Sequence, residues 1–153
     1  MNPIEAEKWE ERYRLPEYWA GKEPAEFLKE VLPWLAPGGT ALDVAMGEGR
    51  NSVFLAQQGW RVAGVDAASA ALAKAESLAR ERGVWVARWT SGISVLPRHP
   101  GLLLHQADLE TDALPAGPFG VVTCFNYLQR SLFRSLEERV ALGGYLVYET
   151  YTL

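Results

Sequence analysis

The sequence lacks several features that would point to particular classes of protein. It contains one cysteine, Cys124, so neither an internal disulfide framework nor a multi-cysteine metal site is predicted. No apolar run approaches the roughly 18 residues of a membrane-spanning helix, and the charged segment from Met1 to Arg14 lacks the apolar centre of a signal peptide. We therefore expect a cytoplasmic protein that does not span a membrane.

An excess of positive charge is also missing. Lys and Arg total 15 against 19 for Asp and Glu, which gives a net charge of -4. A general nucleic-acid binder needs a basic surface that replaces phosphate counterions, so nucleic-acid binding is not expected. The two histidines, His99 and His105, lack the spacing of metal ligands, and no metal site is predicted.

The sequence does contain the alternation of strand and helix patterns that is typical of an α/β domain. Its 153 residues fit one domain, 1–153, with an N-terminal helical segment or lid, 1–37, and an α/β core, 38–153. Hydrophobic periodicity predicts helices at 25–35, 51–58, 70–82 and 132–140, and strands at 40–45, 60–65, 84–89, 102–106, 121–125 and 145–150. These elements predict a Rossmann-like, doubly wound, mainly parallel sheet that binds ligands at the carboxyl ends of its strands.

A glycine-bearing turn, Met46–Arg50, follows the first predicted strand. Small residues at such a turn let a ligand approach the backbone closely. The dinucleotide-binding fingerprint requires a third glycine where Ser52 stands, which disfavours an NAD-dependent oxidoreductase without removing that alternative. Asp66 ends the second predicted strand, and its carboxylate can accept both hydroxyls of a ribose, whether that ribose belongs to NAD or to another nucleoside.

Five segments, in this order, resemble the motifs of class I S-adenosylmethionine-dependent methyltransferases. They are Asp43-Val-Ala-Met-Gly-Glu-Gly49, Gly64-Val-Asp66, Gln106-Ala-Asp108-Leu109, the stretch from Phe119 to Arg130, and Ala141 to Glu149 with its Gly-Gly turn. The match covers about residues 38–150, and the segments 125–130 and 148–152 further resemble small tellurite-resistance-type methyltransferases. Two positions depart from the family pattern. Ala45 replaces a glycine, which is tolerable if the backbone there keeps φ negative, and Gly120 replaces an acidic residue.

The resemblance implies S-adenosyl-L-methionine as the cofactor and methyl transfer to a small-molecule acceptor. In this family an acid such as Asp43 suits the positively charged methionine end, and Asp108 and Leu109 stand where the adenine is held. The predicted cofactor-binding residues are Asp43, Ala45, Met46, Gly47, Gly49, Asp66, Ala67, Asp108, Leu109 and Phe125. The candidate acceptor-binding residues are Tyr13, Asn126, Tyr127 and Arg130, and no catalytic residue is identified.

Most of these residues also have an ordinary structural interpretation. Asp43 is equally explained as a strand-end carboxylate bonded to backbone amides, Asp66 as a helix N-terminal acid, Asp108 as part of a solvated acidic loop, and Arg130 as a surface arginine. Aromatic side chains of the N-terminal segment fit either a lid over the cofactor or packing on the sheet: Trp9, Tyr13 and Trp19.

The last predicted strand, 145–150, lies almost at the end of the sequence, whereas the family fold normally continues with a helix and two further strands. The expected strand order, 3-2-1-4-5, therefore leaves strand five as a long apolar edge. Such an edge predicts either pairing with another chain, as in a homo-oligomer, or a truncated methyltransferase. A second functional hypothesis is a degenerate domain that binds the cofactor without activity and acts as a subunit or interaction module.

Overall fold

The structure is a computed structural model that describes residues 1–35, 38–90 and 95–151. Within these ranges the chain forms a 6-stranded sheet with the order β3-β4-β2-β1-β5-β6, and the recorded strand pairs are all parallel. The strands are β1 (Thr40–Val44), β2 (Arg61–Asp66), β3 (Val86–Arg88), β4 (Gly101–Gln106), β5 (Phe119–Phe125) and β6 (Val140–Glu149). The helices are α1 (Pro3–Arg14), α2 (Glu26–Val31), α3 (Arg50–Gln57), α4 (Ser69–Glu81) and α5 (Phe133–Glu138), with short 3-10 turns η1 (Leu32–Trp34) and η2 (Arg130–Leu132).

The expected strand order is confirmed, with one addition. The predicted order 3-2-1-4-5 corresponds to β4-β2-β1-β5-β6, and β3 extends the sheet beyond β4 at the edge opposite β6. The predicted strand at 84–89 is shorter than expected: β3 comprises Val86–Arg88, which pair with β4 in the register Val86↔Leu102.

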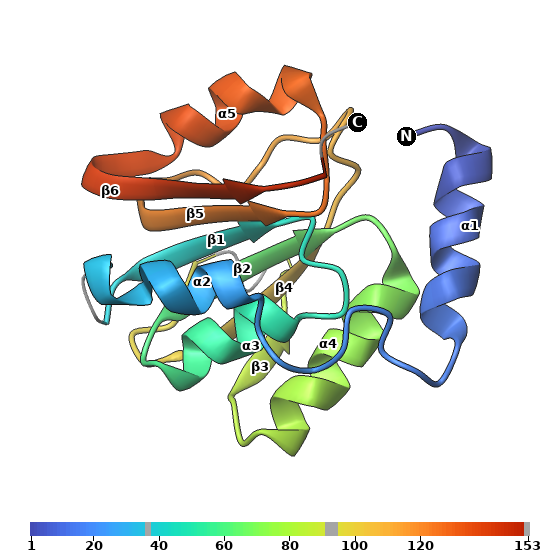
Figure 1. Ribbon diagram of the computed structural model, residues 1–153, viewed down its shortest axis with the longest axis horizontal. Helices are drawn as coiled ribbons and strands as arrows, with labels where there is room; N and C mark the ends of the chain where they lie inside the picture. Colours follow the sequence, from blue (N-terminus) through green and yellow to red (C-terminus); the bar gives the residue numbers. More distant parts are fainter. Residues whose placement is uncertain (36–37, 91–94, 152–153) are drawn as a thin grey trace.

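Two hydrophobic clusters cover the two faces of the sheet. Helices α2, α3 and α4 lie together on one face (Figure 1), where Leu28, Leu55 and Leu72 are buried. The other face is covered by α5 and by the loop between β4 and β5, which contribute Leu136 and Leu114. Strand side chains alternate between faces, so the buried side chains of β1 are divided between the two clusters and the strand is covered on both sides.

β6 begins earlier than predicted and contains the Gly-Gly pair as a register irregularity rather than as a preceding turn. A Cβ on Gly144 would lie 2.6 Å from the carbonyl oxygen of Gly120, so glycine is required where β5 and β6 approach each other. A Cβ on Gly120 would lie 3.3 Å from the Thr40 carbonyl oxygen. This tight packing gives a physical reason for the departure from an acidic residue at position 120.

Among the described residues, β6 lies at one edge of the sheet, as the sequence predicts for the last strand. It ends the strand order next to β5, and several large apolar side chains on it are exposed: Leu142, Tyr145 and Leu146. None of the helices in the described ranges is both long and apolar enough to cross a membrane.

Helix α1 stands across the carboxyl ends of the strands, beyond the arrowheads in Figure 1, and packs against α4. Glu10 on α1 fixes this arrangement, because its carboxylate accepts hydrogen bonds from the Ser69 hydroxyl (2.6 Å) and the Ala70 amide (2.9 Å). The residue that precedes α4, Ala68, offers no side-chain cap. Glu10 therefore supplies from another helix the acceptor that the first turn of α4 needs.

Candidate functional site

A cavity of about 360 Å³ lies at the carboxyl ends of β1, β2 and β5, with α1 forming one wall. Its volume falls within the usual range of small-molecule sites. The sheet topology reverses between β1 and β5, which is where parallel α/β sheets bind ligands. Most of the residues predicted from the sequence line it: Tyr13, Asp43, Ala45, Met46, Gly47, Asp66, Ala67, Leu109, Phe125, Asn126 and Tyr127. Gly49, Asp108 and Arg130 do not belong to the lining.

The turn after β1 lines the cavity, and several of its residues have positive φ values, which favour glycine. Gly47 and Gly49 have φ of 57° and 87°. Ala45 has φ of 55°, so the expectation of a negative φ at this alanine is wrong, and the backbone there carries strain that glycine would not. Gly49 has a packing role, because a Cβ there would lie 2.7 Å from the Ala75 side chain. It lets the start of α3 approach α4.

Asp66 connects the end of β2 to the glycine turn. Its Oδ2 accepts the Gly47 amide at 2.9 Å, and its Oδ1 accepts the Ala68 amide at 3.0 Å. Burial raises the pKa of Asp66, and these amide hydrogen bonds oppose the increase. Each carboxylate oxygen retains a lone pair that can accept a ligand hydroxyl. Asp66 can therefore act both as an acid at the N-terminus of a helix and as a carboxylate that binds a ligand.

Asp43 is 1% exposed, yet it contributes to the cavity lining. Its two oxygens accept hydrogen bonds from Ser52 Oγ (2.6 Å) and Thr123 Oγ1 (2.8 Å), so its partners are side-chain hydroxyls and not the backbone amides considered from the sequence. Burial raises the pKa of Asp43 to about 6, and the two hydroxyls limit that rise. The site thus holds a buried carboxylate between neutral donors.

Asp108 is not among the residues that line the cavity. Its side chain, 38% exposed, lies 3.3 Å from the Met1 amino group and accepts the Glu110 amide at 2.9 Å. Its own amide donates to Asp112 at 2.7 Å. These contacts favour the solvated-loop interpretation of Asp108, while its neighbour Leu109 does line the cavity. A contact between Asp108 and adenine stays a prediction.

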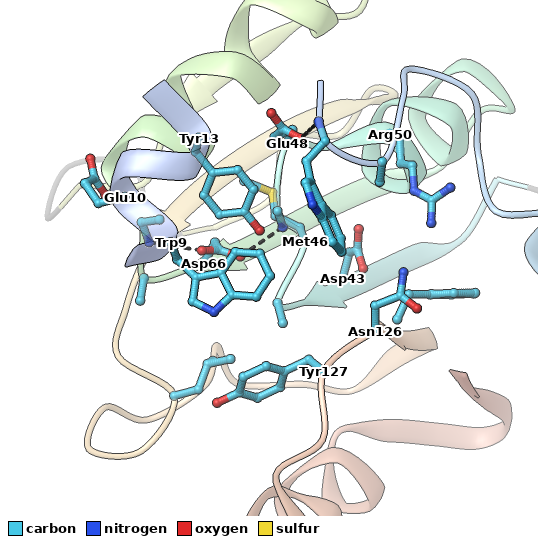
Figure 2. A pocket seen from close by; sticks show the side chains of 18 of the residues that line it. Trp9, Glu10, Tyr13, Asp43, Met46, Glu48, Arg50, Asp66, Asn126 and Tyr127 are labelled. Carbon is cyan, nitrogen blue, oxygen red and sulfur yellow. Dashed lines mark hydrogen bonds between the residues drawn. The ribbon is translucent and has the colours of Figure 1, made fainter. Parts of the chain in front are cut away.

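Aromatic side chains from the N-terminal segment cover the cavity. Trp9 stacks on Tyr13 and meets Trp19 edge-on, with ring centroids 5.5 Å apart in both pairs, and the Arg12 guanidinium lies about 5 Å from both indoles. A Cβ on Gly47 would lie 3.3 Å from the Tyr13 hydroxyl, so the tyrosine sits directly on the glycine turn. In Figure 2, Trp9 and Tyr127 lie on opposite sides of the hollow.

The residues that hold this segment in place were not found from the sequence. Glu48, inside the glycine turn, accepts the Trp19 amide at 2.6 Å and pairs with Lys74 at 2.7 Å. Asn51, in the first turn of α3, accepts the Ala25 amide at 2.8 Å. The available signal was the acidic residue Glu48 between the two glycines of the turn, Gly47 and Gly49. Its partners are distant in sequence, so the pattern alone could not assign them.

The wall formed by the segment after β5 is also fixed by hydrogen bonds. Asn126 adopts φ of 57°, a conformation that asparagine tolerates, and its amide donates to the Glu149 carbonyl at 2.8 Å. The Gln129 amide group donates to the Leu109 carbonyl at 3.1 Å, which joins this segment to the loop after β4. Arg130 is exposed. The fully buried Cys124 has its pKa raised to about 12 by burial, which fits a core thiol.

A parallel sheet, a glycine turn after its first strand, and a carboxylate at the end of the adjacent strand together define a nucleoside-binding α/β protein of the Rossmann-like class. The family follows from comparison with known proteins. A family model described as a methyltransferase domain matches residues 12–153, and the chain belongs to this family. The resemblance to class I S-adenosylmethionine-dependent methyltransferases is thereby confirmed.

Solved structures share the fold at low sequence identity. A TehB-like SAM-dependent methyltransferase from Corynebacterium glutamicum is 18% identical with a TM-score of 0.64, and the match covers 96% of this chain and 73% of that one. A SAM-dependent methyltransferase from Geobacter sulfurreducens in complex with S-adenosyl-L-homocysteine is 16% identical (TM-score 0.65; 92% and 54% covered). Coclaurine N-methyltransferase bound to N-methylheliamine and SAH is 17% identical (TM-score 0.60; 80% and 34% covered).

These neighbours support the prediction that S-adenosyl-L-methionine is the cofactor, because ligands related to it are bound in two of them. The chain spans from about a third to about three quarters of the length of these neighbours. A search of curated proteins found no match.

Proposed function

We propose that this protein binds S-adenosyl-L-methionine in the cavity at the carboxyl ends of β1, β2 and β5 and transfers its methyl group to a small-molecule acceptor. The observation that carries the proposal is the placement of the buried Asp43 carboxylate, the half-buried Asp66 carboxylate and the Gly47 turn around one hollow of about 360 Å³. Family membership supports the reaction class.

The residues present fit this cofactor chemically. Asp66 offers free lone pairs to a ribose diol, and the apolar side chains of Ala67 and Leu109 offer a surface for an adenine ring. Asp43 offers a carboxylate to the end of the molecule that carries the ammonium and sulfonium charges. The Gly47 backbone lacks a side chain that would fill the space above the turn, where the Tyr13 hydroxyl now lies.

When bound, S-adenosyl-L-methionine supplies a methyl group that is already activated by the positive sulfur. The protein therefore needs chiefly to orient the acceptor and to exclude water. The aromatic cover formed by Trp9, Tyr13 and Trp19 excludes water from one side of the cavity. Burial raises the pKa of Tyr13 far above its ordinary value, so its hydroxyl stays protonated and acts as a hydrogen-bond donor rather than as a base.

The acceptor is proposed to approach from the side of Asn126 and Arg50. A second hollow, of about 400 Å³, shares these two residues with the cavity and is lined in addition by Glu26 and Glu149. Its walls provide both carboxylates and a guanidinium, which suits a polar small molecule. Tyr127, on the cavity wall, is placed to contact the same acceptor.

The competing proposal is a domain that binds the cofactor without catalysing transfer. The strained φ of Ala45 and the absence of Asp108 from the cavity lining favour it, because both depart from what the methyltransferase motifs predict. In that case the fold and the cofactor site serve an interaction, and turnover is absent.

Turnover separates the two proposals. The protein is incubated with methyl-labelled S-adenosyl-L-methionine and a panel of small amines, phenols, thiols and metalloid oxyanions, and S-adenosyl-L-homocysteine is quantified by mass spectrometry. Acceptor-dependent formation of this product, lost in an Asp43→Asn/Asp66→Ala double variant, supports the methyltransferase. Cofactor binding with no turnover on any acceptor supports the binding domain.

A further inference from the structure

Asp43 on β1 is paired in register with Thr123 on β5 and with Gly64 on β2, so the three residues form one row across the sheet. Its side chain lies on the face covered by α3, the helix that carries Ser52. The carboxylate is therefore surrounded by one neighbour from each adjacent strand and by the first turns of α3.

The two hydroxyl contacts depend on this row. Thr123 Oγ1 is 2.8 Å from Asp43 Oδ1, and Ser52 Oγ is 2.6 Å from Oδ2. Gly64 makes the second contact feasible, because a Cβ there would lie 3.1 Å from Ser52 Oγ and would overlap the Met46 sulfur. An ionised carboxylate only accepts hydrogen bonds, so both hydroxyls act as donors.

This arrangement leaves part of the carboxylate available. Two oxygens have about four lone-pair sites, and the hydroxyls use two of them. The charged or titratable groups that face Asp43 are the Asp66 carboxylate, the Arg50 guanidinium and the neutral Cys124 thiol. The second carboxylate raises the pKa of Asp43 and the guanidinium lowers it, both by less than the two hydroxyls do.

We propose that Ser52 and Thr123 are positioning residues of the cofactor site. Their hydroxyls fix the Asp43 carboxylate so that its remaining lone pairs face the cavity and accept hydrogen bonds from the positively charged amino-acid end of the cofactor. The inference rests on the proposed function. It assigns a role to the serine that replaces the third glycine of the dinucleotide fingerprint, and to a threonine that is fully buried in β5.

A purely structural role for the hydroxyls makes a different prediction. If they only satisfy a buried carboxylate, their removal lowers stability and weakens every ligand of the cavity equally. If they position Asp43, their removal weakens ligands that carry the amino-acid group and spares 5′-methylthioadenosine, which keeps the nucleoside and the sulfur but lacks that group.

The test compares Ser52→Ala and Thr123→Val with the unaltered protein by calorimetric titration between pH 5 and pH 9. The probes are S-adenosyl-L-methionine and 5′-methylthioadenosine. Thr123→Ser restores the hydroxyl and serves as the rescue variant. Thr40→Val serves as the matched control, because it also removes a threonine hydroxyl, but at the first residue of β1. There the hydroxyl contacts the Gly120 amide at 3.4 Å.

We expect Ser52→Ala and Thr123→Val to weaken S-adenosyl-L-methionine by about tenfold at pH 8, which corresponds to one hydrogen bond to a charged group. The affinity for 5′-methylthioadenosine stays within about twofold in both variants, and Thr123→Ser recovers most of the loss. The pH below which affinity falls moves upward in both variants, because each loses a donor that stabilises the ionised carboxylate.

Equal losses for both probes, or unchanged affinity and an unchanged pH midpoint, overturn the positioning role. Should Thr123→Val not fold, Ser52→Ala alone decides the question, since it removes only one oxygen atom from a site next to Gly64. If the unaltered protein binds 5′-methylthioadenosine but not S-adenosyl-L-methionine, the proposed function fails and the inference fails with it. That result differs from a failure of the hydroxyl role alone.

Discussion

The Gly47 amide and the Asp66 carboxylate are joined by a hydrogen bond of 2.9 Å that links the turn after β1 to the end of β2. The other carboxylate oxygen accepts the Ala68 amide at 3.0 Å. The side chain proposed to hold the ribose therefore also holds the backbone that approaches the ligand. One residue connects the geometry of the turn to the binding of the cofactor.

Replacing this carboxylate tests both roles. We predict that Asp66→Ala weakens S-adenosyl-L-methionine binding by about 1–3 kcal/mol, the scale of hydrogen bonds to a charged group, and also lowers the free energy of unfolding because two amides lose their acceptor. Asp66→Asn keeps one acceptor oxygen and should give a smaller loss of both. Calorimetry and urea denaturation measure the two effects. An unchanged affinity in Asp66→Ala removes this residue from the site.

The buried carboxylate of Asp43 makes stability depend on pH in a defined direction. Its pKa is raised from 3.8 to about 6 in the folded protein, so the native state holds the proton more tightly than the unfolded chain does. The favourable contribution is complete below about pH 4 and is lost as the pH rises through 6. We predict that the neutral variant Asp43→Asn is more stable than the unaltered protein at pH 8, by about 1–3 kcal/mol.

Urea denaturation at pH 4, 6 and 8 checks this prediction. The difference in unfolding free energy between Asp43→Asn and the unaltered protein should grow with pH and should vanish near pH 4. In this variant one of the Ser52 and Thr123 hydroxyls can donate to the amide oxygen and the other can accept from the amide NH2, so the variant should fold. A variant that is less stable at pH 8 than at pH 4, relative to the unaltered protein, would contradict the burial of an ionised carboxylate at this position.

The ion pair between Glu48 and Lys74 anchors the segment around Trp19 to the glycine turn. Its side chains are 4% and 14% exposed, so its loss should matter more than that of a surface pair. We predict that Glu48→Gln lowers the free energy of unfolding by about 3 kcal/mol, and accelerates hydrogen exchange of backbone amides in residues 1–21. Arg134→Gln breaks the pair with Glu138, whose members are 90% and 57% exposed, and serves as the matched control.

The control should change the unfolding free energy by less than about 0.5 kcal/mol, the usual scale of an exposed i,i+4 pair. Hydrogen exchange followed by mass spectrometry resolves the N-terminal segment from the rest of the chain. Equal exchange in residues 1–21 of the unaltered protein and of Glu48→Gln would show that the segment is held by its aromatic contacts rather than by this carboxylate.

The free edge of β6 predicts association between copies of the chain. Strand edges that carry exposed apolar side chains pair with other strands unless charge or coverage prevents it. We predict a concentration-dependent increase in mass by size-exclusion chromatography with light scattering. Leu146→Lys should suppress the increase, whereas Gln57→Lys, on the exposed end of α3, should not. A monodisperse monomer at all concentrations would contradict the pairing.

The order of the central strands followed from sequence because these strands are short apolar runs next to glycine or aspartate residues, such as Gly39 before β1 and Asp66 at the end of β2. Parallel strands that alternate with helices have few right-handed arrangements. The length of β3 was less accessible to this reasoning, because it is set by pairing with β4 and not by its own pattern, and the paired residues are Val86–Arg88.

The sequence predicted the site residues whose position follows from the local pattern of strands and turns. It missed the residues whose role depends on tertiary contacts. Residues at strand ends, such as Gly47 and Asn126, were found because their position in the chain fixes their position in the fold. The contact of Glu48 with Trp19, and the Ser52 hydroxyl on Asp43, depend on how α3 and the N-terminal segment pack. No spacing rule in a single sequence records such contacts.

The cavity beneath α1 is proposed to bind S-adenosyl-L-methionine. Calorimetric titration of the unaltered protein at pH 8 with S-adenosyl-L-methionine, S-adenosyl-L-homocysteine and NAD tests it most directly. We expect saturable binding of the first two at one site per chain, with no comparable binding of NAD. Tight binding of NAD alone, or no binding of either sulfur nucleoside, would contradict it.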